Sequence, residues 1–230
     1  MASVRQLVSV TSGVLGAILV TTSAPAAPVA NEPTLMETRV LAALNDARLN
    51  PQAYIADLAA YRKRFKNKLV TMPGSRVKYL TREGTVPIDE AVEFLNSEES
   101  RSQLRAGSIL AAAAADHVAE QGRSGHTGHI GSNGSGPADR TSRRGGGRLV
   151  AEVITYGAFD AADVVRQLIV DDGVPDRGHR SAIFADRLRY AGVACGYHPK
   201  FRTMCVIDMA ETPDGTSRSL RPSRLASIAG

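Results

Sequence analysis

The chain has 230 residues, of which 43% are hydrophobic and only 5% aromatic, with a formal net charge of +5. This length allows one domain with a full hydrophobic core. The two cysteines, Cys195 and Cys205, form no Cys-x-x-Cys motif, which argues against a structural zinc cluster or a thioredoxin-like redox centre.

The N-terminus has the three parts of a secretory signal peptide. One positive charge in residues 1–5 precedes a largely apolar run over residues 7–20, and Ala24-Pro-Ala26 offers a cleavage site. The apolar run is shorter than the roughly 18–20 residues that a membrane anchor requires. We therefore expect residues 1–26 to be removed, leaving 230 − 26 = 204 residues of a secreted, extracellular or periplasmic protein with no stable membrane span.

Helical spacing of apolar residues continues over residues 34–65, with a break at Asn50-Pro51. Pro51 suits the first position of a second helix because its φ is fixed and it lacks an amide donor. Residues 66–87 hold several glycines and prolines and predict a loop or loose hairpin. Ile88–Asn96 then predicts a short amphipathic helix.

A strong helix is predicted at Ile109–Gln121, where five consecutive alanines occur and Gly122 is expected to end it. The glycine-rich stretch Ser124–Gly147 predicts a loop. A strand at Leu149–Tyr156, a helix at Ala161–Val170 and a helical turn at His179–Phe184 follow.

The last predicted elements are two strands of a hairpin, Tyr190–Tyr197 and Arg202–Ala210. Helices flanking a small antiparallel sheet define an α+β domain. Cys195 and Cys205 lie in these two strands, where they can face each other. In an exported protein a disulfide is expected, and two buried free thiols are the alternative.

Charge is unevenly distributed along the chain. Residues 62–82 contain eight basic and no acidic side chains, and residues 83–100 contain six acidic and no basic ones. Nucleic-acid binding favours an unopposed basic face with aromatic residues for stacking, so we expect no nucleic-acid partner. We interpret the segment as a self-complementary insertion, although attraction to anionic polymers or lipid head groups stays open.

The candidate metal-ligating and acid–base residues lie between His129 and His179. Glu152 lies in an apolar strand, where a carboxylate needs a partner. Asp171 and Asp172 end a helix, where the helix dipole disfavours negative charge unless a cation, a histidine or an arginine compensates. Two imidazoles and two or three carboxylates are the ligands of a divalent-metal site or the groups of an acid–base site.

The other histidines are weaker candidates. His117 lies on the core side of the alanine-rich helix, which favours a buried structural role. His126 precedes His129 by three residues and is a reserve ligand, and His198 at the hairpin tip is expected to be exposed. The Gly131–Gly136 stretch matches no phosphate-binding motif, and no Gly-x-Ser-x-Gly nucleophile elbow is present.

Several motifs resemble the CAP superfamily of cysteine-rich secretory, antigen 5 and pathogenesis-related proteins, and in particular its bacterial secreted branch. They include the first helix with Arg48, and Glu152 at the glutamate of a Gly-Glu-Asn-Ile box. The other matching segments are Leu110–His117, His129-Ile-Gly-Ser-Asn-Gly-Ser135 and Gly178-His179-Arg180-Ser-Ala-Ile183. Val153 departs from the family pattern because it replaces the asparagine of that box.

The resemblance implies an α-β-α sandwich with a small antiparallel sheet between helices. The CAP (SCP-like) domain would span residues 34–211, with the charged insertion at about 66–100 and a polar, basic tail at 212–230. It also implies secretion and a central cleft formed by His129, Glu152, Asp171 and His179, with Asp172 as the alternative acid.

The leading hypothesis is a secreted CAP protein whose cleft binds a divalent metal, zinc first, and which has an extracellular binding or interaction role. Its ligand would be a lipid, sterol, glycan or protein. One rival is a metal-assisted hydrolase in which Glu152 or Asp171 deprotonates a bound water. The other is a structural envelope protein in which the four side chains form an inert polar network.

Overall fold

The structure is a computed structural model that describes residues 32–74 and 76–218. The predicted signal peptide and residues 219–230 of the tail lie outside the described residues. Seven helices lie in the described chain: α1 (Leu35–Leu49), α2 (Pro51–Arg62), α3 (Val86–Ser97), α4 (Ser108–Ser124), α5 (Pro137–Arg143), α6 (Ala161–Val170) and α7 (Gly178–Phe184). None of these described helices has the length and hydrophobicity that a transmembrane span requires.

The strands form two separate sheets. The main sheet has the order β4-β6-β7-β5 and is antiparallel except for the short parallel pair β4–β6. A smaller antiparallel sheet has the order β1-β2-β3. The strands are β1 (Phe65–Lys66), β2 (Leu69–Thr71), β3 (Lys78–Leu80), β4 (Arg105–Ala106), β5 (Ala151–Tyr156), β6 (Tyr190–His198) and β7 (Arg202–Ala210).

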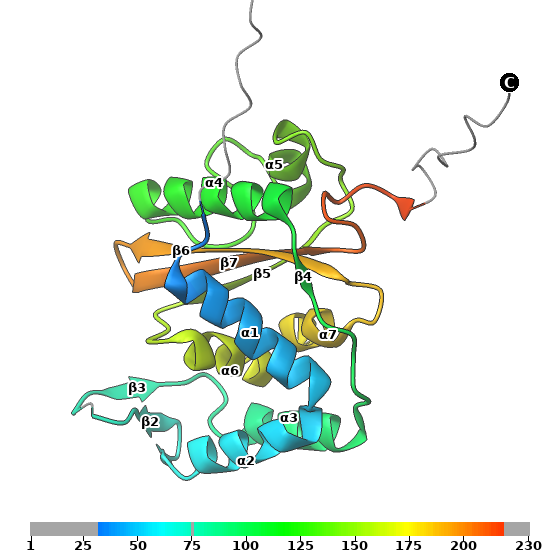
Figure 1. The fold of residues 1–230 in the computed structure, drawn as a ribbon. Helices are drawn as coiled ribbons and strands as arrows, with labels where there is room; N and C mark the ends of the chain where they lie inside the picture. Colours follow the sequence, from blue (N-terminus) through cyan, green and yellow to red (C-terminus); the bar gives the residue numbers. More distant parts are fainter. Residues whose placement is uncertain (1–31, 75, 219–230) are drawn as a thin grey trace, which may run out of the picture.

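The main sheet lies between two layers of helices (Figure 1). α4 and α5 cover one face, and α1, α6 and α7 cover the other, with α2 and α3 beyond them. Val153 and Ile207 pack toward α1 and α6, whereas Ile154 and Val206 pack toward α4. This alternation along β5 and β7 buries both faces of the sheet and confirms the predicted α-β-α sandwich.

Local sequence explains where the first helices begin. Thr34 and Glu37 form a capping box at the start of α1, each satisfying an amide that the helix leaves free. Pro51 begins α2, as predicted. Gly192 sets how closely α4 approaches the sheet, because a Cβ there would lie only 1.9 Å from the amide nitrogen of Ala111.

Three predicted elements differ in the structure. α4 continues through Gly122 and ends at Ser124, followed by Gly125, whose positive φ of 69° forms the left-handed C-cap. The glycine-rich loop contains the helix α5, which begins at Pro137. α7 is seven residues long instead of one turn. The glycine content of residues 124–147 hid α5, which packs against α4, because tertiary contacts override local propensity.

The hairpin prediction is confirmed. Cys195 and Cys205 are register partners on β6 and β7, and they form a disulfide. Residues that are directly opposite on antiparallel strands have β-carbons close enough to be joined by a disulfide. The bond therefore links the two central strands of the main sheet.

Candidate functional site

His129 and Glu152 meet at one edge of the main sheet. His129 Nδ1 lies 2.9 Å from Glu152 Oε1, and Arg140 on α5 donates to Glu152 Oε2 at 2.6 Å. The Glu152 side chain is only 1% exposed, whereas that of His129 is 47% exposed. The carboxylate predicted to need a partner in an apolar strand therefore has two.

These partners keep Glu152 ionised. Burial by itself raises the pKa of a carboxyl group, but the hydrogen bond from His129 and the charge of Arg140 outweigh it and lower the pKa of Glu152. Both oxygens already accept strong hydrogen bonds. Glu152 is consequently better suited to orienting His129 than to taking a proton from water.

The second histidine–carboxylate pair is Asp171 with His179. Asp171 ends α6 in the left-handed conformation, with φ at 60°. Its Oδ1 accepts from His179 Nδ1 at 2.6 Å, and its Oδ2 accepts from the His179 amide at 2.9 Å. The acid at the unfavourable end of the helix is thus compensated by the first turn of α7.

Asp172 points elsewhere. Its two oxygens accept from the backbone amides of Arg82 and Glu83, at 2.7 and 2.8 Å, in the segment that precedes α3. Asp171 is therefore the acid that the fold brings to His179, and Asp172 anchors the predicted insertion.

The two pairs face each other. The ring centres of His129 and His179 are 6.3 Å apart, with the planes inclined by 44°. Because a carboxylate only accepts hydrogen bonds, each Nδ1 carries a proton, which leaves Nε2 of each ring as the atom with a free lone pair. Within residues 32–74 and 76–218, no group of three or more His, Cys, Asp and Glu side chains is arranged to hold a metal ion.

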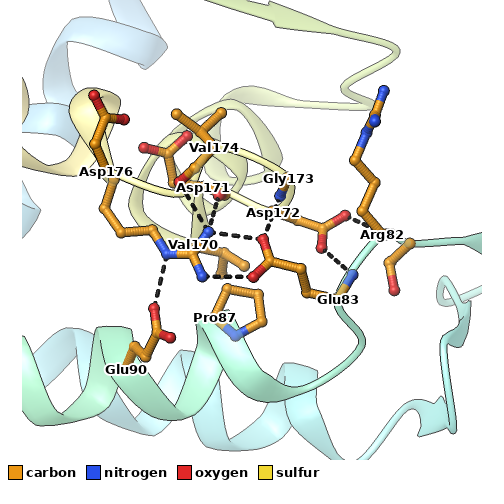
Figure 2. A network of polar contacts seen from close by, with 12 residues as sticks. Arg82, Glu83, Pro87, Glu90, Val170, Asp171, Asp172, Gly173, Val174 and Asp176 are labelled. Atoms are coloured by element: carbon orange, nitrogen blue, oxygen red, sulfur yellow. Dashed lines mark hydrogen bonds and ion pairs between the residues drawn. The ribbon is translucent and has the colours of Figure 1, made fainter.

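An ion-pair network holds the Asp171–His179 loop in place (Figure 2). Arg177 donates to both carboxylate oxygens of Glu83 at 2.8 Å, and to Glu90 at 2.7 Å. The same guanidinium donates to the Asp171 carbonyl at 2.9 Å, and the Gly173 amide donates to Glu83 at 2.6 Å. The segment before α3 is therefore joined to the loop that carries the second histidine.

Arg180, next to His179, completes the support of this loop. It is 4% exposed and donates to the carbonyls of Ile169 and Val170, which end α6, and to the carbonyl of Pro87 in α3. An arginine here satisfies carbonyls that the helix cannot satisfy itself. Its role is structural.

A groove of about 840 Å³ begins at this loop. Asp171 and His179 line one part of it, whereas His129 and Glu152 do not. Aromatic and basic side chains form much of the remaining wall. These are Tyr61, Tyr79, Tyr156, Phe159, Phe201, Arg166, Lys200 and Arg202.

The sequence analysis missed Asp208. This residue is the register partner of Glu152 on β7 and is 0% exposed. As a carboxylate it has no hydrogen-bond donor in the described chain, and the Glu152 carboxyl group is its hydrogen-bonding neighbour. Burial and then the negative charge of Glu152 raise the pKa of Asp208 well above its usual value, against the charge of Arg140. A single acid in the apolar run Met204–Met209 is the same signal that singled out Glu152.

The remaining histidines have structural positions. His117 is 1% exposed on α4, as predicted, and its Nε2 lies 2.8 Å from the Gly128 carbonyl. The prediction for His198 was wrong, because it is 0% exposed. Its Nε2 donates to the His126 carbonyl, and its Nδ1 accepts from the amides of Lys200 and Phe201, so it closes the β6–β7 turn. The His126 side chain is exposed.

Comparison with known proteins gave one family. The model of the CAP family, described as the cysteine-rich secretory protein family, matches residues 41–209. Searches of curated proteins and of solved structures found no match. The matched residues include most of both outer helix layers, the main sheet except Ala210 and both histidine–carboxylate pairs, so the chain belongs to the CAP family.

Proposed function

We propose that this protein is an exported binding protein that holds an amphipathic ligand, with an apolar chain and an anionic head, in the groove beside His179. The groove carries this proposal. Its volume of about 840 Å³ is in the range of small-molecule sites, and aromatic rings make much of its wall. Export is supported by the signal-peptide pattern, by the disulfide and by membership of a family of secreted proteins.

The distribution of charge supports an anionic head group. Lys200 and Arg202 lie at the β6–β7 turn, where they line the groove. Of the described residues, three acids line the groove, and each accepts hydrogen bonds. Asp163 accepts from Arg166, Asp171 from His179, and Asp172 from two backbone amides. An apolar chain along Tyr79 and the neighbouring rings would place its acidic end beside Arg202 and Lys200, whose ammonium group lies over the Phe201 ring.

We propose that a divalent metal binds between the two imidazoles as a two-histidine site. Zinc lies about 2.0–2.1 Å from an imidazole nitrogen, so two rings on one tetrahedral ion have centres about 5 Å apart. The observed separation is 6.3 Å, so binding of zinc requires the two rings to move closer together. His129 and His179 would bind through Nε2, while Glu152 and Asp171 orient the rings. Bound zinc would supply a Lewis acid at the rim of the groove.

The test measures displacement of a fluorescent fatty acid by palmitate and by hexadecanol, its uncharged analogue. Tyr79→Ala should weaken both ligands severalfold, and Lys200→Ala should weaken palmitate only, because the alcohol has no charge to lose. Tyr197→Ala is the matched control, since this ring is 60% exposed and does not line the groove. Absence of saturable binding, or equal effects of the two tyrosine variants, would contradict the proposal.

A further inference from the structure

The outer face of the β1–β2–β3 sheet combines lysines with exposed leucines. Lys66 on β1 is the partner of Leu69 on β2, which is in turn the partner of Leu80 on β3. Side chains of partnered residues share a face, and so do residues two apart, which adds Lys78. We call Lys66, Leu69, Lys78 and Leu80 the outer face.

The two faces of this sheet differ in burial. On the inner face, Val70 is 3% exposed, and Tyr79, although 38% exposed, packs against Phe159. On the outer face, Leu69 is 38% exposed and Leu80 is 77% exposed. A sheet with one face on the protein normally presents polar residues on the other, so a pair of adjacent exposed leucines needs a reason.

The surrounding charge is of one sign. Residues 62–82 carry eight basic side chains and no acidic one. Asp89 neutralises Arg62, which is one of these eight, whereas Glu83 pairs with Arg177 and Asp172 accepts from backbone amides. Figure 1 shows β2 and β3 standing out at the side of the molecule, away from the main sheet. The outer face therefore keeps its positive field and is accessible to a flat partner.

We propose that the outer face binds the surface of an anionic lipid bilayer, with the lysines at the head groups and the two leucines entering the interface. Basic residues around protruding apolar side chains are the combination that such surfaces attract. A soluble polyanion would use the lysines but would gain nothing from the leucines. Leu80 also lines the groove, but Lys66, Leu69 and Lys78 do not, so variants of these three residues test the outer face separately from ligand binding in the groove.

The experiment is sedimentation of the protein with vesicles of phosphatidylcholine alone and of equal parts phosphatidylcholine and phosphatidylglycerol. Binding is expected only to the anionic vesicles and should weaken as salt rises. Lys66→Ala and Lys78→Ala should each lower the partition coefficient about fivefold. Leu69→Ser should lower it severalfold at unchanged charge.

Matched controls use exposed residues elsewhere in the described chain. Arg39→Ala and Arg187→Ala remove equal charge, and Leu149→Ser changes a leucine that is 60% exposed. The proposal is overturned if the lysine variants bind like the arginine controls, or if Leu69→Ser binds like Leu149→Ser. If the lysine variants lose vesicle binding and Leu69→Ser does not, the outer face binds polyanions in general, and the bilayer proposal is wrong. Fatty-acid displacement, measured without vesicles, tests the groove separately.

Discussion

Glu152 and Asp208 lie directly opposite each other on β5 and β7, yet only Glu152 accepts hydrogen bonds from basic side chains. These come from His129 and Arg140, whereas Asp208 has no such donor in the described chain and its polar neighbour is the Glu152 carboxyl group itself. Two adjacent buried carboxylates repel each other, so the site favours one charge, on Glu152, and one neutral acid, Asp208.

Replacing Asp208 with asparagine should therefore stabilise the protein at neutral pH. A carboxyl group whose pKa is raised by folding contributes stability that is fully present below its unfolded pKa of about 3.9. This stability is lost as pH rises toward the folded pKa. The free energy of unfolding of Asp208→Asn should therefore exceed that of the wild type by an amount that increases as pH rises from about 4. Urea unfolding across pH measures it, with exposed Asp46→Asn as control. A constant difference at all pH values would contradict the raised pKa.

The Glu83–Arg177 pair should give the opposite pH dependence. Hydrogen bonds from Arg177 and from the Gly173 amide lower the pKa of Glu83 to about 2, from 4.5. A lowered pKa contributes stability that is present above the unfolded value and is lost as pH falls toward the folded one. Glu83→Gln should therefore be less stable than wild type at pH 7, and the two melting temperatures should converge between about pH 4.5 and 2.

Arg177→Lys tests the geometry of the same network. A lysine keeps the charge but cannot reach both Glu83 oxygens, Glu90 and the Asp171 carbonyl together. We expect the melting temperature to fall by a few degrees and palmitate affinity to weaken, since His179 lines the groove. Arg62→Lys is the matched control, because its pair with Asp89 is exposed on both sides. An equally small change in melting temperature for both variants would show that the network does not position the Asp171–His179 loop.

The disulfide between Cys195 and Cys205 should contribute on the order of 2–3 kcal/mol to the free energy of unfolding, mainly by restricting the unfolded chain. Comparing wild type with the Cys195→Ser, Cys205→Ser double variant in urea measures this. Thiol titration of denatured, non-reduced protein should find no free thiol. Finding two thiols would overturn the bond.

Zinc affinity should depend on both imidazoles. A ligating imidazole must be neutral, so affinity should fall steeply below about pH 6.5. His129→Ala and His179→Ala should each weaken calorimetric zinc binding by more than tenfold, whereas His126→Ala, at an exposed side chain, should not. Wild-type affinity in the double variant His129→Ala, His179→Ala would rule out the site.

Glu152→Gln separates a binding role from the hydrolase hypothesis. An amide keeps a hydrogen bond to His129 but cannot take a proton. The binding proposal expects nearly unchanged palmitate displacement and no hydrolytic activity in either protein. Hydrolysis by the wild type that is lost in this variant, while zinc is retained, would favour the hydrolase.

The sequence by itself determined the elements with a strong local signal. Proline geometry predicts the break at Asn50-Pro51, and helical periodicity predicts α6. Alternation of apolar and polar residues predicts the β6–β7 hairpin with its two cysteines. All three signals depend on neighbouring residues only. The sequence also identified Glu152 as a carboxylate in need of partners, because an acid in an apolar strand violates a local rule.

Only the tertiary structure decided which partners these residues have. The partner of Glu152 is Arg140, and the partner of Arg177 is Glu83. His179 is paired with Asp171 and not with Asp172. Each of these contacts joins residues that the fold brings together from distant elements. Register decided that Asp208 lies opposite Glu152, and packing over the β6–β7 turn buried His198 at a tip that its sequence marks as exposed. Burial and pairing depend on the whole fold, which no local pattern encodes.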